Sequence, residues 1–204
     1  MGRWLKGLLS RLESRTVGID LSGSERRPSG WAVLEGASVL EASLLGPDEE
    51  LLEATTRVEP ALVAIDAPLS LPREGYTRPV DREMHRLGLP VLPPLFPAMK
   101  LLTLRGIKLA EQLAARGLQV IEVHPASTRK VLGLPVKSRK AVQEALLEAG
   151  LEGVLEEREL SMHELDAITA ALTASLHLLG LSDVVGDEEG TICLPRRDLS
   201  LAER

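Results

Sequence analysis

Val17-Gly18-Ile19-Asp20-Leu21-Ser22 is the stretch that decides the fold, because it places a carboxylate in an apolar run just before a polar turn. The run predicts a strand over 16–22, with Gly18, Asp20 and Ser22 on one face. Two later apolar runs also end in a carboxylate, at Asp66 and at Glu122. A carboxylate buried at a strand end is costly unless it is paired, hydrogen-bonded or bound to a metal. The three runs therefore indicate one shared site.

The segments around these runs predict the order of the elements. The predicted strands are 16–22, 30–35, 38–45, 61–67, 118–123 and 190–195. The predicted helices are one that begins at 47–50 and those at 80–87, 98–117, 137–149 and 159–179. A three-stranded meander followed by strands that alternate with helices predicts an α/β fold with a mixed sheet flanked by helices, which is the order of the ribonuclease H-like fold.

One domain is expected over 16–204, with a proline-rich insert at about 68–97 and an N-terminal helix or extension at 1–15. The apolar residues of 1–14 have helical spacing with basic residues between them. A packed or frayed helix explains this pattern, and a membrane-surface or targeting helix is the alternative.

The composition of the chain narrows the range of possible functions. The net charge of −6 argues against tight binding along many phosphates, because that affinity comes from Lys and Arg, but it allows a small phosphate substrate. The single cysteine, Cys193, excludes an intrachain disulfide and any cysteine-based metal site, and it suits a reducing compartment. No run approaches the roughly 18 apolar residues that span a membrane. We therefore expect a cytoplasmic protein with no integral membrane association.

Four carboxylates are the candidate metal ligands and catalytic groups: Asp20, Asp66, Glu122 and Asp166. The carboxyl ends of neighbouring parallel strands meet at one sheet edge, where α/β sites form. The small apolar residues around Asp166 predict a helix that packs closely on the sheet and directs Asp166, and His163 with it, toward this edge. Glu164 follows Ser161 by three residues, as in a capping box.

Hard oxygen ligands without a thiolate suit Mg²⁺ or Mn²⁺. Two such ions would activate a water and stabilise the leaving oxygen of a phosphodiester. Each carboxylate taken alone also suits a structural role in a turn or cap. A set in which every carboxylate already has its own cationic neighbour would argue against a catalytic metal site.

A second group of candidates lies at 77–86, where Arg78, Arg82 and His85 fall on one helix face with Asp81 close by. The two arginines would grip a phosphate, and His85 would donate a proton to a leaving group. A solvated charged helix with i,i+4 pairs is the alternative.

Two further positions are weaker candidates. His124 shares the face of Glu122 and is either a ligand or a hydrogen-bonded structural histidine. Ser22 would contact phosphate through its turn, although serine is also an ordinary turn residue. Arg105 is not a candidate, because with Lys100 and Lys108 it has the spacing of a solvent-exposed helix face.

Five motifs in order resemble the DUF429 family, a set of predicted nucleases of the ribonuclease H-like superfamily. They are Gly18–Ser24 with Ser29–Val33, Ala64–Pro72, Arg78 with Asp81, Ile121–Ala126 and Asp166–Ala174, and the match extends to Pro195. The first and last motifs are also similar to Holliday-junction resolvases. That similarity implies metal binding by Asp20, Asp66 and Asp166, with His163 where some resolvases place a further ligand, whereas Glu122 belongs to the DUF429 pattern. An acidic chain lacks the basic surface that a four-way junction would require.

The first functional hypothesis is a metal-dependent phosphodiester hydrolase acting on nucleic acid or a nucleotide. The alternative is a non-catalytic nucleotide- or nucleic-acid-binding regulatory protein of the same fold. An actin-like or sugar-kinase-like phosphotransferase also opens with Gly-Ile-Asp and a turn, but it needs two such domains. The sequence leaves a homodimer open.

Overall fold

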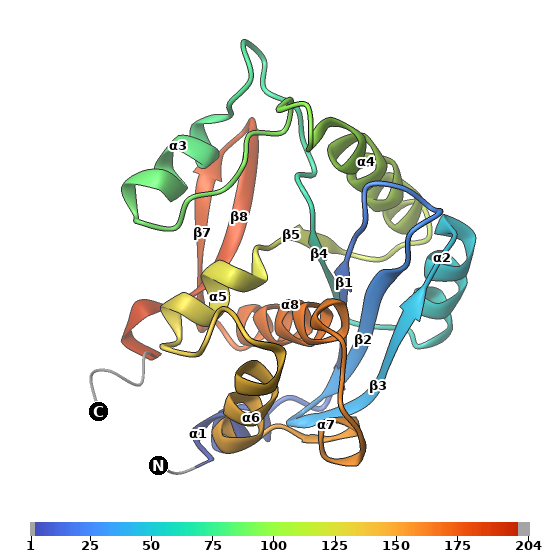
Figure 1. Cartoon of the computed structure of the whole chain (residues 1–204), viewed down its shortest axis with the longest axis vertical. Coiled ribbons are helices and arrows are strands. Elements are labelled where there is room, and N and C mark those ends of the chain that lie inside the picture. The colour runs from blue at the N-terminus through green and yellow to red at the C-terminus, as the bar shows by residue number, and fades with distance from the viewer. Residues whose placement is uncertain (1–2, 200–204) are drawn as a thin grey trace.

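A mixed six-stranded sheet forms the centre of the computed structural model, which describes residues 3–199 (Figure 1). The strand order is β5-β4-β1-β2-β3-β6. The bounds are β1 Arg15–Asp20, β2 Ser29–Glu35, β3 Ser38–Leu45, β4 Leu62–Asp66, β5 Val120–Glu122 and β6 Glu152–Gly153. Strands β1, β2 and β3 are antiparallel, whereas β4 and β5 join parallel to β1. The predicted mixed sheet, with antiparallel strands followed by parallel ones, is therefore confirmed.

The strand register decides which carboxylates share a face. Asp20 pairs directly with Asp66, so both side chains point to the same side of the sheet. Glu122 pairs with Ile65 instead, one residue before Asp66. Because successive side chains alternate between faces, Glu122 leaves its strand toward the face opposite to Asp66.

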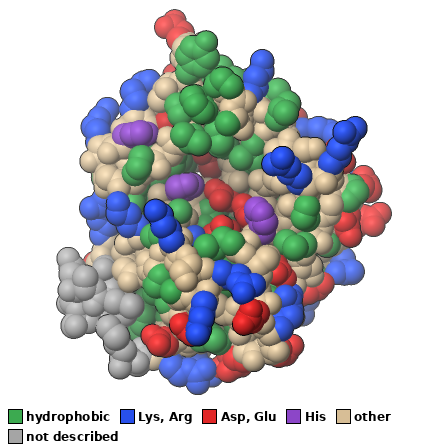
Figure 2. Space-filling model, in the orientation of Figure 1, with side chains coloured by type: hydrophobic (Ala, Val, Ile, Leu, Met, Phe, Trp, Pro, Cys, Tyr) green, Lys and Arg blue, Asp and Glu red, His purple; other side chains and the backbone are tan. Residues whose placement is uncertain are grey.

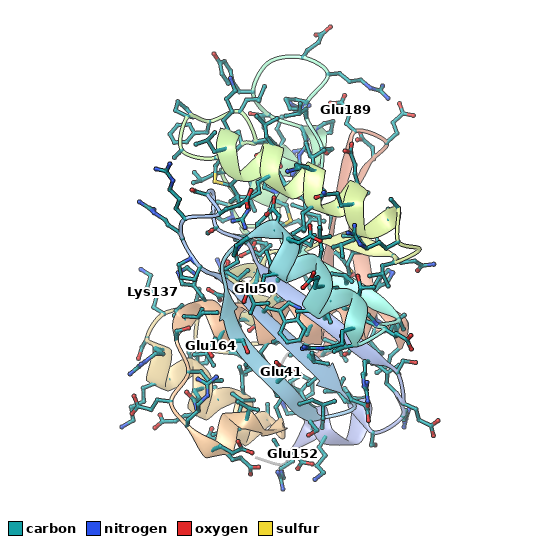
Figure 3. All side chains as sticks on the ribbon, turned by 90° about the vertical axis from the view of Figure 1, so that its right-hand side faces the viewer. Glu41, Glu50, Lys137, Glu152, Glu164 and Glu189 are labelled. Carbon is teal, nitrogen blue, oxygen red and sulfur yellow. The ribbon has the colours of Figure 1, made fainter. Side chains whose placement is uncertain are left out.

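Helix α8 (Met162–Leu178) covers the face that carries Asp20 and Asp66. It lies close to β1 and β2 because both strands have a glycine at the contact. A Cβ on Gly18 would lie 1.9 Å from the Ala167 carbonyl oxygen, and one on Gly30 would lie 2.0 Å from that of His163. The helix begins at the predicted capping box of Ser161 and Glu164 (Figure 3).

The opposite face is covered by α2 (Asp48–Arg57) and α4 (Lys100–Ala114), which lie across the sheet in Figure 3. Leu51 of α2 and Leu109 of α4 belong to one buried cluster with Ile19 and Ile65. Burial of these aliphatic side chains on both faces provides the apolar core that an aromatic-poor sequence must build from Leu, Val, Ile and Ala.

Most of the remaining elements lie beside helix α8 or beside strand β5 (Figure 1). Leu5 and Leu9 of α1 (Trp4–Leu9) are buried in the same cluster as Leu146 of α6, so this N-terminal helix is packed. The other bounds are α3 Pro79–Arg86, α5 Pro125–Val131, α6 Arg139–Ala149, α7 Val154–Glu157, β7 Ser182–Asp187, β8 Gly190–Pro195 and a short 3-10 helix at Arg197–Leu199.

Strands β7 and β8 form a separate antiparallel pair, against which α3 packs. Both α3 and β8 were predicted, whereas α5 and β7 were not. Within residues 3–199, no helix is long and apolar enough to cross a membrane.

Candidate active site

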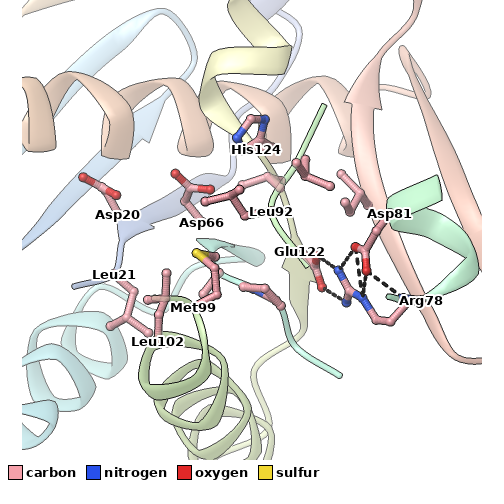
Figure 4. Close-up of a pocket in the computed structure, with 15 residues that line it drawn as sticks. Asp20, Leu21, Asp66, Arg78, Asp81, Leu92, Met99, Leu102, Glu122 and His124 are labelled. Atoms are coloured by element: carbon pink, nitrogen blue, oxygen red, sulfur yellow. Dashed lines mark hydrogen bonds and ion pairs between the residues drawn. The ribbon is translucent and has the colours of Figure 1, made fainter. Parts of the chain in front are cut away.

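A cavity of about 200 Å³ opens at the carboxyl ends of β1, β4 and β5 (Figure 4). Asp20 and Asp66 lie at one end of it, and Arg78, Asp81 and Glu122 lie at the other. Apolar side chains line the space between, among them Leu92, Met99 and Leu102. The space-filling view shows this face as a hollow with acidic side chains inside and histidines around it (Figure 2).

Asp66 differs from the other candidate carboxylates in its bonding. No hydrogen bond or ion pair joins its side chain to any residue in the described part of the chain. Burial raises the pKa of Asp66 well above its usual value, and the neighbouring charges of Asp20 and Asp166 raise it further. The strand register and helix α8 thus place Asp20, Asp66 and Asp166 near enough for their charges to interact.

Asp166 is paired with Arg129, a residue of α5 that was not predicted as part of the site. The Arg129 Nη1 donates to Asp166 Oδ1 at 2.6 Å and to Thr169 Oγ1 at 3.1 Å. The Arg129 side chain is only 2% exposed, and its Nε has no acceptor within residues 3–199. Burial raises the pKa of Asp166, while the charge of Arg129 opposes that shift.

His163 is paired with Asp20, on the side of α8 predicted for it. Its Nδ1 lies 2.5 Å from Asp20 Oδ2, and the His163 side chain is 57% exposed. The hydrogen bond to Asp20 raises the pKa of His163, although partial burial acts in the opposite direction.

Glu122 belongs to a different ionic cluster, which Figure 4 shows at the far end of the cavity. Arg78 donates from Nη1 and Nη2 to both oxygens of Glu122, each at 2.7 Å. It also donates to Asp81, with the shortest distance, 2.8 Å, from Nη2 to Oδ1. Burial raises the pKa of Glu122 against the opposing effect of Arg78, whose own pKa is raised by its hydrogen bonds to both carboxylates despite burial.

The predicted phosphate grip on one face of helix 80–87 is not what the structure contains. Arg78 precedes α3 as its N-cap residue and is only 1% exposed, because Asp81 and Glu122 surround it. Arg82 and His85 are exposed, and each contacts a backbone carbonyl, of Thr77 and Val91 respectively. The three side chains therefore do not converge on one ligand.

The weaker candidates have structural partners. His124 is the N-cap residue of α5, and its Nδ1 lies 2.7 Å from Ser127 Oγ. Burial together with the nearby Arg129 lowers the pKa of His124 to about 4. The Ser22 hydroxyl donates within its own turn, and Arg105 donates to it at 2.7 Å. Arg105 was predicted to be exposed, but it is buried and paired with Asp48.

The predicted cage of four carboxylates is not preformed. Within residues 3–199, no three Asp, Glu, His or Cys side chains lie close enough together to hold a metal ion. Three of the four candidate carboxylates are paired with an arginine or histidine side chain, and Asp66 is the one of the four that has no such pair within residues 3–199. The role of Arg129 was not predicted, because its partner Asp166 is 37 residues away in the chain.

Solved structures with a similar arrangement include two of a Thermus thermophilus protein. One is described as RuvC in complex with Holliday junction substrate, with 17% identity and a TM-score of 0.45. The other, described as the RuvC structure, has 18% identity and a TM-score of 0.47. Each match covers 81% of this chain and 96% of the other.

No curated protein matches this sequence. The family model described as "Protein of unknown function (DUF429)" matches residues 18–190. Because this match spans most of the sequence, the chain belongs to the DUF429 family.

Proposed function

We propose that this protein is a divalent-metal-dependent phosphodiester hydrolase, a nuclease acting on nucleic acid or a nucleotide. The observation that carries the proposal is Asp66, a carboxylate with no partner in the described part of the chain, set beside two further aspartates. Such a group is unfavourable for stability and is explained by a ligand that supplies positive charge.

The donor set fits Mg²⁺ or Mn²⁺, because Asp20, Asp66 and Asp166 would each supply carboxylate oxygens and the cavity lining contains no thiol. Asp20, Asp66 and Asp166 would hold the ion after their side chains move closer together than they lie in the structure. Glu122 falls outside this proposed set, since both of its oxygens are bonded to Arg78. When bound, the metal would activate a water and neutralise charge on the phosphate.

The chain's own residues would orient the substrate and move protons. His163 is exposed beside Asp20, where it can exchange a proton with a bound group or with solvent. His124 lines the cavity and is neutral at pH 7, so it can bond to a substrate without adding charge. The apolar side chains of Leu92, Met99 and Leu102 would keep water from the reacting phosphate.

The test is cleavage by the purified full chain with Mn²⁺, on labelled single-stranded, duplex and four-way-junction oligonucleotides and on a nucleotide. Asp20→Asn and Asp66→Asn should each lose more activity than the roughly 10–100-fold that removal of a supporting partner costs. The matched control is Asp183→Asn, an equal change at an exposed position of β7, which should keep full activity. Activity in Asp66→Asn equal to that of the unaltered chain would remove the basis of the proposal.

A second function is favoured by the pairing of Asp20 and Asp166 with His163 and Arg129. A non-catalytic nucleotide- or nucleic-acid-binding protein of this fold would need no metal between these carboxylates. Nucleotide binding without turnover at any Mn²⁺ concentration, unchanged in Asp66→Asn, is the result that would select this alternative.

A further inference from the structure

Arg129 places a positive charge beside Asp166, one of the proposed metal ligands, so a bound metal ion would compete with Arg129 for this carboxylate. Its side chain is buried, and it is an ion-pair partner of Asp166, which is itself 20% exposed. Its charge acts to lower the pKa of both Asp166 and Asp66, so it lies within the field of the two aspartates. Arginine stays protonated at all working pH values, so this positive charge is permanent.

The guanidinium of Arg129 is incompletely satisfied. Only Nη1 donates to partners in the described part of the chain, to Asp166 and Thr169. The buried Nε has no acceptor there. Arginine binds carboxylates most strongly through two parallel hydrogen bonds, and Arg129 makes only one to Asp166. The Arg129–Asp166 contact is accordingly easier to displace than the Arg78–Glu122 contact, which has two parallel hydrogen bonds.

We infer that Arg129 is a positioning residue that holds the Asp166 carboxylate at the sheet edge until a divalent cation takes its place. The inference rests on the proposed function, because it needs the metal site of Asp20, Asp66 and Asp166. A doubly charged ion among these aspartates repels the guanidinium and competes with it for Asp166 Oδ1. Metal binding and the Arg129–Asp166 contact therefore oppose each other.

The experiment is a calorimetric Mn²⁺ titration of the full chain at pH 8, with Arg129→Met and Arg129→Lys as variants. Arg129→Met should bind Mn²⁺ at least about five-fold more tightly than the unaltered chain, the lower end of a typical coupling between two sites. Arg129→Lys, which keeps a positive charge, should have a Mn²⁺ affinity between those of the unaltered chain and of Arg129→Met. A residue with a merely structural role predicts the opposite sign, because its removal would loosen Asp166 and weaken Mn²⁺ binding.

The matched control is Arg158→Met. Arg158 pairs with Glu164, which lies on the same helix two residues before Asp166, at 2.6 Å. Its removal should leave the Mn²⁺ affinity unchanged. Asp66→Asn should abolish binding in every background.

A measurement on the unaltered chain covers the case in which the Arg129 variants do not fold. With ¹⁵N-labelled arginine, the Arg129 Nε–Hε signal should shift on Mg²⁺ addition with the same midpoint as metal binding, whereas an unmoved signal overturns the inference. If the unaltered chain binds Mn²⁺ through Asp66 but Arg129→Met binds no more tightly, only the role of Arg129 is overturned. Absence of Mn²⁺ binding in all variants overturns that role and the proposed metal site together.

Discussion

Two buried arginines, Arg78 and Arg129, lie beside carboxylates at the same edge of the sheet, but their environments differ. Arg78 donates through Nε, Nη1 and Nη2, to Asp81, Glu122 and Ser70. Arg129 donates through Nη1 alone and leaves its Nε without an acceptor in residues 3–199. The two side chains are buried to a similar extent, but they differ in how many of their nitrogens have a hydrogen-bond acceptor. A fully satisfied cluster stabilises a fold, and an incompletely satisfied one is where a ligand finds free bonding capacity.

Replacing Arg78 should give the largest effect. Arg78→Met leaves the carboxylates of Glu122 and Asp81 buried without a counterion, and removal of one partner of a buried pair costs about 3–5 kcal/mol. Urea unfolding at pH 7 measures this loss. Arg129→Met should cost less, because Asp166 remains partly exposed to water.

Arg15→Met is the control for this comparison, since Arg15 forms an exposed pair with Glu35. Its loss should lie within about 1 kcal/mol. Equal losses for Arg78→Met and Arg129→Met would show that the two clusters do not differ in the way their hydrogen bonds indicate.

His124 lines the cavity together with Arg78 and Glu122, and it should make the protein sensitive to acid. Its pKa is lowered to about 4, mainly by burial and then by Arg129. Between pH 6.5 and 4 the unfolded chain takes up a proton that the folded one does not, so stability falls as the pH falls through this window. The expected contribution is about 2–3 kcal/mol.

His124→Asn should remove this part of the acid sensitivity, as measured by urea unfolding at pH 7 and pH 4.5. His177→Asn is the matched control, because the His177 Nδ1 also bonds to a serine hydroxyl, that of Ser182. In an NMR titration, Arg129→Met should raise the pKa of His124, and Arg78→Met should leave it in place. The same shift in both variants would contradict the assignment of this effect to Arg129.

Neutralising one carboxylate from each cluster should change the stability of the protein in opposite directions. Asp66→Asn should stabilise the metal-free protein by about 1–2 kcal/mol at pH 8, because it removes an unpaired charge beside Asp20 and Asp166. Since the folded-state pKa of Asp66 is raised, its ionisation lowers stability as the pH rises from about 4. Glu122→Gln should destabilise instead, because Arg78 loses a charged partner. Chemical denaturation of both variants measures the two signs, and a destabilised Asp66→Asn would contradict the unpaired state of Asp66.

The fold was predictable because its signals are local. Apolar runs ended by turn residues predicted β1 to β5, and the small-residue helix with its capping box predicted α8. Strand β7 was missed because its side chains are mostly exposed, so it has no apolar run. Helix α5 was missed because Pro125, its first residue, also suits the end of a strand.

The site was predictable only in part, because its pairing depends on register and on distant partners. The places of Asp20, Asp66 and Asp166 in their elements predicted that the three lie near one another. They did not predict that no three acidic, histidine or cysteine side chains within residues 3–199 form a metal-binding group. A one-residue offset between β4 and β5 separates Glu122 from them, and no sequence pattern shows such an offset. The ion pairs of Arg78 with Glu122 and of Arg129 with Asp166 span 44 and 37 residues, so neither follows from helical spacing.

The smallest expected effect concerns His163, the exposed partner of Asp20. The hydrogen bond to Asp20 raises its pKa, so its contribution to stability is complete below pH 6.5 and is lost as the pH rises through the raised value. Exposure limits this contribution to less than about 1 kcal/mol. His163→Gln should therefore differ from the unaltered chain in urea unfolding at pH 6 but not at pH 9. A larger difference at pH 9 than at pH 6 would mean that neutral His163 holds Asp20 through a hydrogen bond and not through an ion pair. A metal ion would then compete with a neutral hydrogen-bond partner at Asp20, whereas at Asp166 it would compete with the positive charge of Arg129.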